Sequence, residues 1–171
     1  MEALQAIFGR RSVRRFQARE IEPRKIETML QAAMAAPSAM NEQPWEFVLI
    51  DRKDSFERIM QVHPYAGMLA TAPLAILVCG NRQREKVPGN YWVLDCSCAT
   101  QNLLLAAHAL GLGAVWTGIF PEKDRMRALS EICDLPAEVL PLALVVVGYP
   151  DGPRPLPADR FQRERIHLNR W

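Results

Sequence analysis

Apolar residues along this chain recur first at helical and then at extended spacings, and glycine and proline mark the changes between them. In the first half these patterns predict a helix over residues 2–8, a charged loop over 10–16, a helix from 22 to about 36, a strand over 45–51 and an amphipathic helix around 56–60. Pro23 fits the first turn of the second helix and Pro37 stops it.

The second half surrounds one long apolar helix with buried strands. Its patterns predict strands over residues 74–80, 114–120 and 140–148, and helices over 91–110 and 121–132. The helix over 91–110 is apolar on more than one face, so we expect it to be buried nearly all round. A chain this small has little room to surround such a helix, so we infer that a second copy covers part of it. The pattern therefore predicts a homodimer.

Composition is that of one ordinary globular domain. The chain has 171 residues, of which 49% are hydrophobic and 23% charged, and it shows no repeat or domain boundary. We therefore expect a single domain over residues 1–171. In its tail, from about residue 150, prolines alternate at 153, 155 and 157. This spacing favours an extended strap that docks through Phe161 and Trp171.

Four cysteines and the start of the chain bear on where the protein works. The cysteines lie in apolar stretches without metal-site spacing, which favours buried thiols; they are Cys79, Cys96, Cys98 and Cys133. The N-terminus has no basic leader followed by an apolar core, and no apolar run is free of glycine and polar residues over the length of a membrane. We expect a soluble cytoplasmic protein.

Positive charge is concentrated in two segments, although the net charge is only +2. The total is too small to imply nucleic acid. Seven of the 21 basic residues lie in residues 10–25, and a second group closes the chain at Arg154, Arg160, Arg163, Arg165 and Arg170. The two segments could converge on one anion.

Several familiar sites are excluded or disfavoured by spacing. The pair Gly111 and Gly113 lacks a third glycine and follows a helix, which is the reverse of a dinucleotide-binding fingerprint. There is no P-loop and no nucleophile elbow. The histidines His63, His108 and His167 lie far apart, so a structural role is favoured over metal ligation.

Three segments remain as candidate sites, each with a plainer alternative. In the first, Arg10, Arg11, Ser12 and Arg14 carry donors suited to a phosphate, although a charged run is more often solvated surface. Residues 37–45 place amide and hydroxyl groups on a loop stiffened by proline, which either carries a site or simply turns. Residues 113–121 contain Gly118, where a planar ligand could approach the backbone; the alternative is a strand ending in a turn.

Taken together and in order, these segments resemble the FMN-dependent nitroreductase family, in particular its small members, over essentially the whole chain. The similar segments are residues 10–16, Pro37-Ser38 with Asn41-x-Gln43-Pro44-Trp45, Asp95-Cys96-Ser97 with residues 99–104 and Gly111-Leu112-Gly113, then Trp116-Thr117-Gly118, Gly148-Tyr149-Pro150 and Asn169-Arg170-Trp171. Each is weak alone, but their shared order and spacing are specific.

The resemblance implies an α+β fold, a three-layer α/β/α sandwich with a mostly antiparallel central sheet. It also implies an intertwined homodimer with two FMN sites at the subunit interface, in which the tail from about residue 150 extends over the partner. Larger members have a lysine two residues before the arginine that matches Arg160, and this chain has Ala158 there. The phosphate would then depend more on the N-terminal loop.

Site residues follow from the same resemblance. Arg10, Ser12 and Arg14 of the loop, with Arg160 of the tail, would hold the phosphate of FMN, and Arg11 would face the pyrimidine side of the flavin. Residues of the second segment would come from the other subunit; they are Pro37, Ser38, Ala39 and Asn41. Thr117 and Gly118 would lie beside the flavin near its N5.

The implied activity is ping-pong oxidoreduction on the flavin. NADH or NADPH would give hydride to N5, and a nitroaromatic, a quinone or another electron-poor acceptor would then take it, with no catalytic side chain and no metal required. Two alternatives stay open. Relatives of the same fold use flavin for reductive dehalogenation or flavin fragmentation. A less favoured, non-enzymatic interpretation makes residues 10–25 an arm that binds nucleic acid or an acidic partner.

Overall fold

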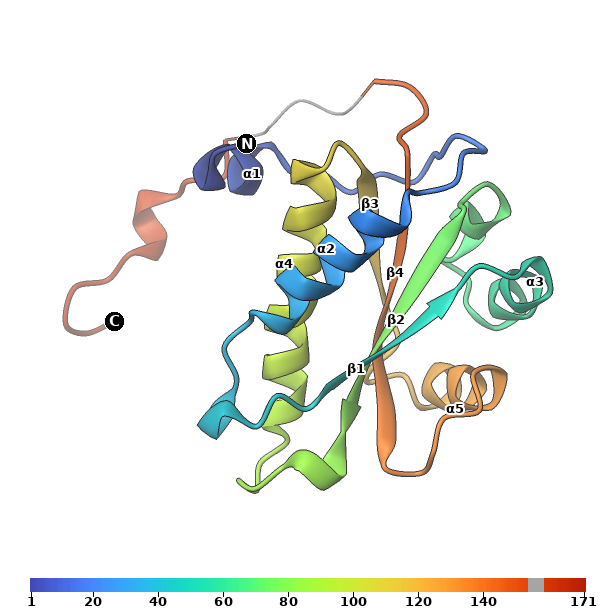
Figure 1. Ribbon diagram of the computed structural model, residues 1–171. Coiled ribbons are helices and arrows are strands. Elements are labelled where there is room, and N and C mark those ends of the chain that lie inside the picture. Colours follow the sequence, from blue (N-terminus) through green and yellow to red (C-terminus); the bar gives the residue numbers. More distant parts are fainter. Residues whose placement is uncertain (154–158) are drawn as a thin grey trace.

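The protein is built on a four-stranded antiparallel sheet, seen in a computed structural model that describes residues 1–153 and 159–171 (Figure 1). The strands lie in the order β1-β2-β4-β3. Their bounds are β1 Trp45–Ile50, β2 Leu74–Asn81, β3 Gly113–Gly118 and β4 Val139–Gly148. Each neighbouring pair is antiparallel. The antiparallel sheet expected from the resemblance is confirmed.

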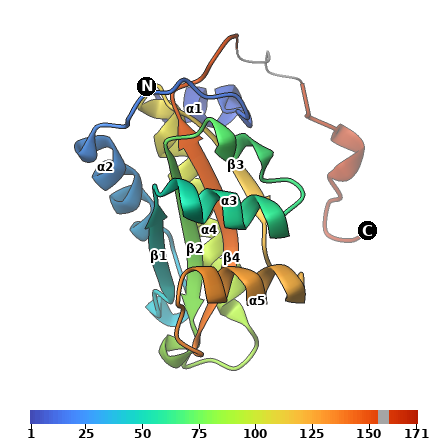
Figure 2. The same ribbon diagram turned by 90° about the vertical axis from the view of Figure 1, so that its right-hand side faces the viewer.

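Helices cover both faces of this sheet. On one face lie α1 Ala3–Gly9, α2 Pro23–Met34 and α4 Tyr91–Ala109; on the other lie α3 Lys53–Val62 and α5 Lys123–Ile132. Figure 2 shows α3 and α5 crossing in front of the sheet, with α4 behind it. Short 3₁₀ turns complete the connections, among them Ala39–Asn41 and Gly67–Ala70. The three-layer α/β/α architecture is therefore confirmed.

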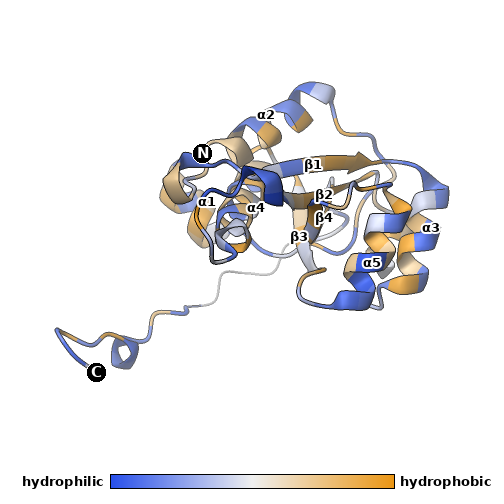
Figure 3. Ribbon diagram, turned by 90° about the horizontal axis from the view of Figure 1, so that it is seen from below, coloured by the Kyte–Doolittle hydropathy of each residue, from blue (hydrophilic) through white to orange (hydrophobic). Residues whose placement is uncertain are grey.

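The two central strands supply both cores, because they are apolar at nearly every position. Side chains alternate between the two faces of a strand. In β2, Ile76 and Val78 pack in the core beneath α2 and α4, whereas Ala75 and Leu77 pack in the core beneath α3 and α5. Seen end-on in Figure 3, the helices turn apolar faces to the sheet and polar faces outward. The prediction of a strand buried on both faces is confirmed.

The long helix α4 is exposed along one stripe in the single chain, and this stripe is the kind of surface that a second copy is expected to cover. Tyr91 and Leu94 are 40% and 60% exposed, and Cys98 and Gln101 continue the stripe at helical spacing. The reason is that the sheet and α2 cover only part of the helix circumference. Cys98 corrects the expectation of four buried thiols, because only Cys79 and Cys96 are fully buried.

Strand β3 ends at Gly118, two residues earlier than the pattern suggested. Ile119 and Phe120 both donate their backbone N–H to the carbonyl of Leu142, at 3.2 and 3.0 Å. The two donors share one acceptor, so the chain leaves the ladder there and turns toward α5. That helix begins at Lys123 rather than at Pro121.

The described part of the tail, residues 159–171, extends away from the sheet and helices (Figure 1). Its aromatic residues are exposed, Phe161 at 71% and Trp171 completely. The prolines 155 and 157 of the predicted strap, together with Ala158, lie outside the described residues. Among the described helices, none combines the length and the apolar character needed to cross a membrane.

Candidate functional site

The N-terminal arginine segment, residues 10–16, runs alongside strand β3. Val13 donates its backbone N–H to the carbonyl of Ala114 at 3.0 Å, and Ser12 forms a parallel bridge with the same residue. A Cβ on Gly113 would lie 2.7 Å from the Val13 side chain, so only glycine lets the segment lie this close. The sequence thus anchors the arginines to the sheet rather than leaving them on a free arm.

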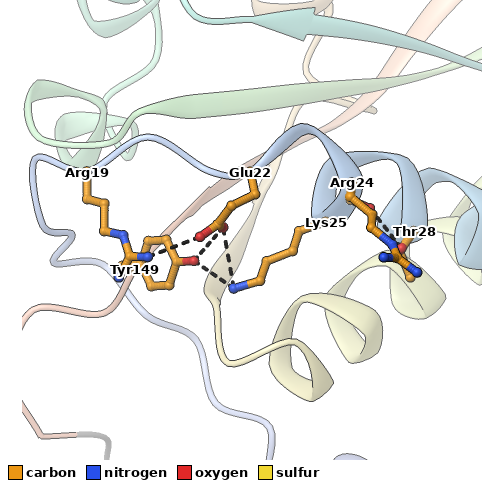
Figure 4. Close-up of polar contacts among 6 residues, drawn as sticks. All are labelled: Arg19, Glu22, Arg24, Lys25, Thr28 and Tyr149. Carbon is orange, nitrogen blue, oxygen red and sulfur yellow. Dashed lines mark hydrogen bonds and ion pairs between the residues drawn. The ribbon is translucent and has the colours of Figure 1, made fainter.

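Part of the basic cluster over residues 10–25 is used to hold the segment in place. The Tyr149 hydroxyl lies between Glu22 Oε2 (2.5 Å) and Lys25 Nζ (2.6 Å), and the Arg19 guanidinium lies 3.8 Å from the centre of the Tyr149 ring while also pairing with Glu22 (Figure 4). Tyr149 donates to Glu22, and this bond contributes most to lowering the pKa of Glu22 to about 2, with a smaller contribution from Lys25. Arg15 pairs with Asp151. These cations have local partners, which disfavours the nucleic-acid arm.

A different set of cations comes together around Arg10. Burial lowers the pKa of Arg10, and the charges of Arg11 and Arg160 lower it further. The structure therefore brings the two basic segments close enough to repel. Within residues 1–153 and 159–171, no carboxylate lies within ion-pair distance of Arg10, Arg14 or Arg160. Arg11 donates to the carbonyls of Phe8 (2.9 Å) and Arg10 (2.5 Å). A phosphate dianion is the kind of group that would relieve this repulsion.

The second candidate segment, after α2, is a tight loop. Pro37 is exposed, and Ser38 accepts the backbone N–H of Gln43 on its Oγ at 3.0 Å. Asn41 accepts the Gln43 side-chain amide on its Oδ1 at 2.9 Å. Ala39 donates its backbone N–H to Asp95 of α4 at 3.0 Å. The loop is thus fixed by its own side chains and by one buried carboxylate.

The third candidate segment ends β3 at an open edge of the sheet. Thr117 is buried and donates its hydroxyl to the carbonyl of Leu144 at 3.0 Å. Ile119 bonds back toward β4, and bonded positions alternate along an antiparallel ladder, so the N–H and carbonyl of Gly118 point away from β4. That carbonyl accepts from Arg125 at 3.2 Å. Apart from Gly118 itself and its two neighbours in the chain, none of the described residues has an atom within 4 Å of where a Cβ of Gly118 would be. An open donor and free space therefore adjoin at this edge.

The first two segments lie at opposite ends of α4 in one chain. The loop over residues 38–43 contacts Asp95 near the start of the helix, whereas Gly9 lies against His108 near its end. Thirteen residues of helix separate these contacts by about 20 Å. In Figure 1 the turn preceding β1 and helix α1 lie at the two ends of α4. Within one chain, therefore, the two sets of residues cannot contact the same small ligand.

Four polar residues in or near these segments were not identified as site residues from the sequence. Asp95 and Glu42 are buried beside the second segment, and Arg125 and His63 lie beside Gly118. Burial and the charge of Arg125 lower the pKa of His63, whose Nδ1 accepts the N–H of Tyr65 at 3.2 Å. Asp95 lies in one of the segments that resemble the family, but its partner Ala39 lies 56 positions away. Spacing gives no signal for such a pair.

Comparison with known proteins matches the chain to one family model, Nitroreductase family, over residues 7–63 and 57–149. A Methanothermobacter thermautotrophicus protein with the provisional name NADH dehydrogenase/NAD(P)H nitroreductase is 46% identical over 171 residues, which cover 100% of this chain and 88% of that protein. A Parabacteroides distasonis crystal structure with the same provisional name has a TM-score of 0.94 at 39% identity, covering 99% and 98% of the two chains. A provisional nitroreductase from Desulfovibrio desulfuricans, solved in complex with FMN, has a TM-score of 0.83 at 27% identity, covering 99% and 97%.

Proposed function

Because the chain belongs to the Nitroreductase family, we propose that it is an FMN-dependent oxidoreductase. It uses NADH or NADPH as the donor and a nitroaromatic, a quinone or a similar electron-poor molecule as the acceptor. It works in the cytoplasm as a homodimer of single-domain subunits with FMN at the interface. The observation that carries this proposal is the approach of Arg10 and Arg160, which come from the two basic segments and have no carboxylate within ion-pair distance among the described residues.

The phosphate end of FMN fits this group of cations. Arg10 and Arg160 supply guanidinium donors, and Arg14 and Ser12 are exposed on the same segment. Mutual repulsion makes the cations costly to hold together without an anion, so a bound phosphate gains both from new bonds and from relief of that repulsion. The resemblance assigns Arg11 to the pyrimidine end, where its charge would stabilise negative charge on the flavin.

The ring system fits the open end of β3. Gly118 offers a backbone N–H that points away from the sheet and free space where other residues have a side chain. Thr117 turns its hydroxyl into the sheet and leaves only backbone toward the ligand. A flat ring can therefore approach the strand edge closely and receive a hydrogen bond from Gly118, near N5 of the flavin.

A second subunit completes the site. Pro37, Ser38, Ala39 and Asn41 lie about 20 Å along α4 from the arginine segment of their own chain, by the rise of the helix. They can join the cofactor only if two copies pack with the ends of α4 exchanged, as in a twofold dimer. The exposed stripe of α4 and the exposed tail aromatics supply apolar surface for such an interface, and the tail from about residue 150 then docks on the partner.

The chemistry requires positioning rather than an acid or a nucleophile from the protein. FMN, when bound, supplies two-electron transfer from NAD(P)H to the acceptor. The cations fix the phosphate, Gly118 fixes the ring edge, and the partner loop closes the other side. Donor and acceptor use the same open face in turn, which gives ping-pong turnover.

Absorbance spectroscopy tests the core of this proposal. Protein saturated with FMN and dialysed should keep a flavin spectrum, bleach with NADH or NADPH under anaerobic conditions, and recover colour when a nitroaromatic or quinone is added. Retained flavin that neither nucleotide bleaches would remove the proposed donor. Folded protein that does not bind excess FMN would overturn the proposal.

Mixed dimers test the shared site. Arg10→Ala and Asn41→Ala variants, each impaired alone, are unfolded together, refolded and purified as tagged heterodimers. If residues 38–41 act on the partner's cofactor, each heterodimer has one site without either substitution and regains about half of the wild-type activity. If both segments served one chain, every site would carry one substitution and no activity would return.

A further inference from the structure

The loop from Ser38 to Gln43 has an unusual backbone. Met40, Asn41 and Gln43 have φ values of 48°, 56° and 50°, in the left-handed region that residues other than glycine rarely occupy. Such conformations persist only where the surrounding structure enforces them. Three left-handed residues within four consecutive positions therefore require a strong constraint from the surrounding structure.

Two buried carboxylates supply that constraint. Asp95 is 5% exposed, and its Oδ1 accepts the N–H of Ala39 at 3.0 Å. Glu42 is 7% exposed, and its Oε1 accepts the N–H groups of Lys86 (2.5 Å) and Val87 (2.8 Å). One carboxylate thus ties the start of the loop to α4, and the other ties its end to the segment before α4.

The buried position of Asp95 costs folding free energy. Its Oδ2 is buried and has no hydrogen-bond partner among the described residues. Burial raises the pKa of Asp95, the hydrogen bond from Ala39 lowers it, and the charges of Glu42 and Glu85 raise it further. An apolar residue of similar size would avoid both penalties. Among the described residues, Asp95 bonds to the N–H of Ala39, and we take this bond as the benefit that offsets them.

The bonds within the loop decide what it presents to its surroundings. Ser38 Oγ and Asn41 Oδ1 already accept hydrogen bonds from Gln43. The Ser38 hydroxyl proton and the Asn41 amide protons remain available, so the loop offers donors. Their direction depends on the left-handed backbone at Met40 and Asn41, and therefore on what holds that backbone.

We propose that Asp95 is a positioning residue, which holds Ala39 so that Ser38 and Asn41 turn hydrogen-bond donors toward the cofactor of the partner subunit. The role rests on the proposed function. Asp95 does not touch the cofactor. It acts by accepting a hydrogen bond on a side-chain oxygen, and this role does not depend on whether the carboxyl group is charged.

The test compares removal of the acceptor, its conservative replacement and a matched control. Asp95→Ala removes the acceptor, whereas Asp95→Asn keeps a carbonyl oxygen for Ala39. Asn102→Ala is the control, because Asn102 also joins α4 to another element, by donating to the carbonyl of Ala32 at 3.0 Å, but lies away from the loop. Ala39→Pro removes the donor instead. Proline is tolerated there, because Ser38 is extended (φ −142°, ψ 155°) and Ala39 is the first residue of its 3₁₀ turn.

Two quantities are measured on the dimeric protein, the FMN dissociation constant and the hydrogen-exchange rate of the loop amides. Asp95→Ala and Ala39→Pro should weaken FMN binding about tenfold or more, the equivalent of losing a hydrogen bond to a charged group. Asp95→Ala should also speed exchange at Ala39. Asp95→Asn and Asn102→Ala should stay within about threefold of wild type in binding, well under that loss.

Each contrary result is decisive. Unchanged exchange in Asp95→Ala, or faster exchange with wild-type FMN affinity, overturns the positioning role. Equal losses in Asp95→Asn and Asp95→Ala overturn the claim that the acceptor acts rather than the charge. If Asp95→Ala does not fold, Ala39→Pro and Asp95→Asn still decide. If wild-type protein binds no FMN, the proposed function fails and the positioning role with it, whereas normal binding by wild type and by Asp95→Ala rejects the positioning role alone.

Discussion

Gly113→Ala should detach the arginine segment from strand β3. The new Cβ would lie 2.7 Å from Cβ and Cγ1 of Val13 and 2.8 Å from its Cγ2, whereas ordinary contact begins at 3.4 Å. Three atoms of a short branched side chain cannot all rotate away, so the backbone of Val13 must retreat by about 0.7 Å. The bond from its N–H to Ala114, 3.0 Å long, would then exceed normal hydrogen-bonding distance.

The expected cost is about 3 kcal/mol of unfolding free energy. Overpacking contributes about 1–3 kcal/mol and the lost hydrogen bond about 1 kcal/mol. For a chain of this length the melting temperature should fall by about 6–12 °C. Because the arginines move with Val13, FMN affinity should fall as well. Urea unfolding of the cofactor-free protein and FMN titration measure the two effects.

Gly67→Ala is the matched control. Beyond its two neighbours in the chain, a Cβ there would meet no atom of the described residues within 4 Å, and Gly67 has no left-handed backbone. Its stability should stay within about 0.5 kcal/mol of wild type, as for most surface changes. If Gly113→Ala were as stable as Gly67→Ala, the close packing of the arginine segment on β3 would be refuted.

Three further changes probe separate parts of the structure. Arg14→Ala should weaken FMN binding by about 1.5–3 kcal/mol, and full flavin occupancy after dialysis would contradict the assignment of Arg14 to the phosphate. The pKa of buried His63 is lowered in the folded state, so the unfolded chain binds more protons below pH 6.5 and wild type loses stability as the pH falls there. His63→Phe should remove that loss. If the urea midpoints of wild type and His63→Phe fell equally between pH 7.5 and 5.5, His63 would not be its cause. Tyr149→Phe should raise the pKa of Glu22 from about 2 toward 4.5, which NMR titration measures. Stability should change little because the contact is exposed. An unchanged pKa of Glu22 would show that the phenol hydroxyl does not lower it.

The sequence was most informative where one local pattern determines a structure. The run over residues 74–80 is apolar at nearly every position, which leaves few alternatives to a strand buried on both faces. Periodicity also located α4, but it could not show which stripe of the helix stays uncovered, because that depends on how far α2 and the sheet reach around it. Arg19 and Lys25 looked equivalent to Arg10 in sequence. Only the fold shows that Tyr149 and Glu22 engage the first two, and that Arg160 approaches the third.

Strand β3 has a consequence for solubility. It is an outer strand, and its sequence from Gly113 to Gly118 contains no charge and no proline, the features that usually keep strand edges of different molecules from pairing. The arginine segment covers the edge of β3 at Ala114, whereas the edge at Gly118 is open to a ligand. A planar cofactor at Gly118 would therefore also block the edge-to-edge strand pairing that leads to aggregation. Protein without the cofactor exposes a short, uncharged strand edge with which a second molecule can pair.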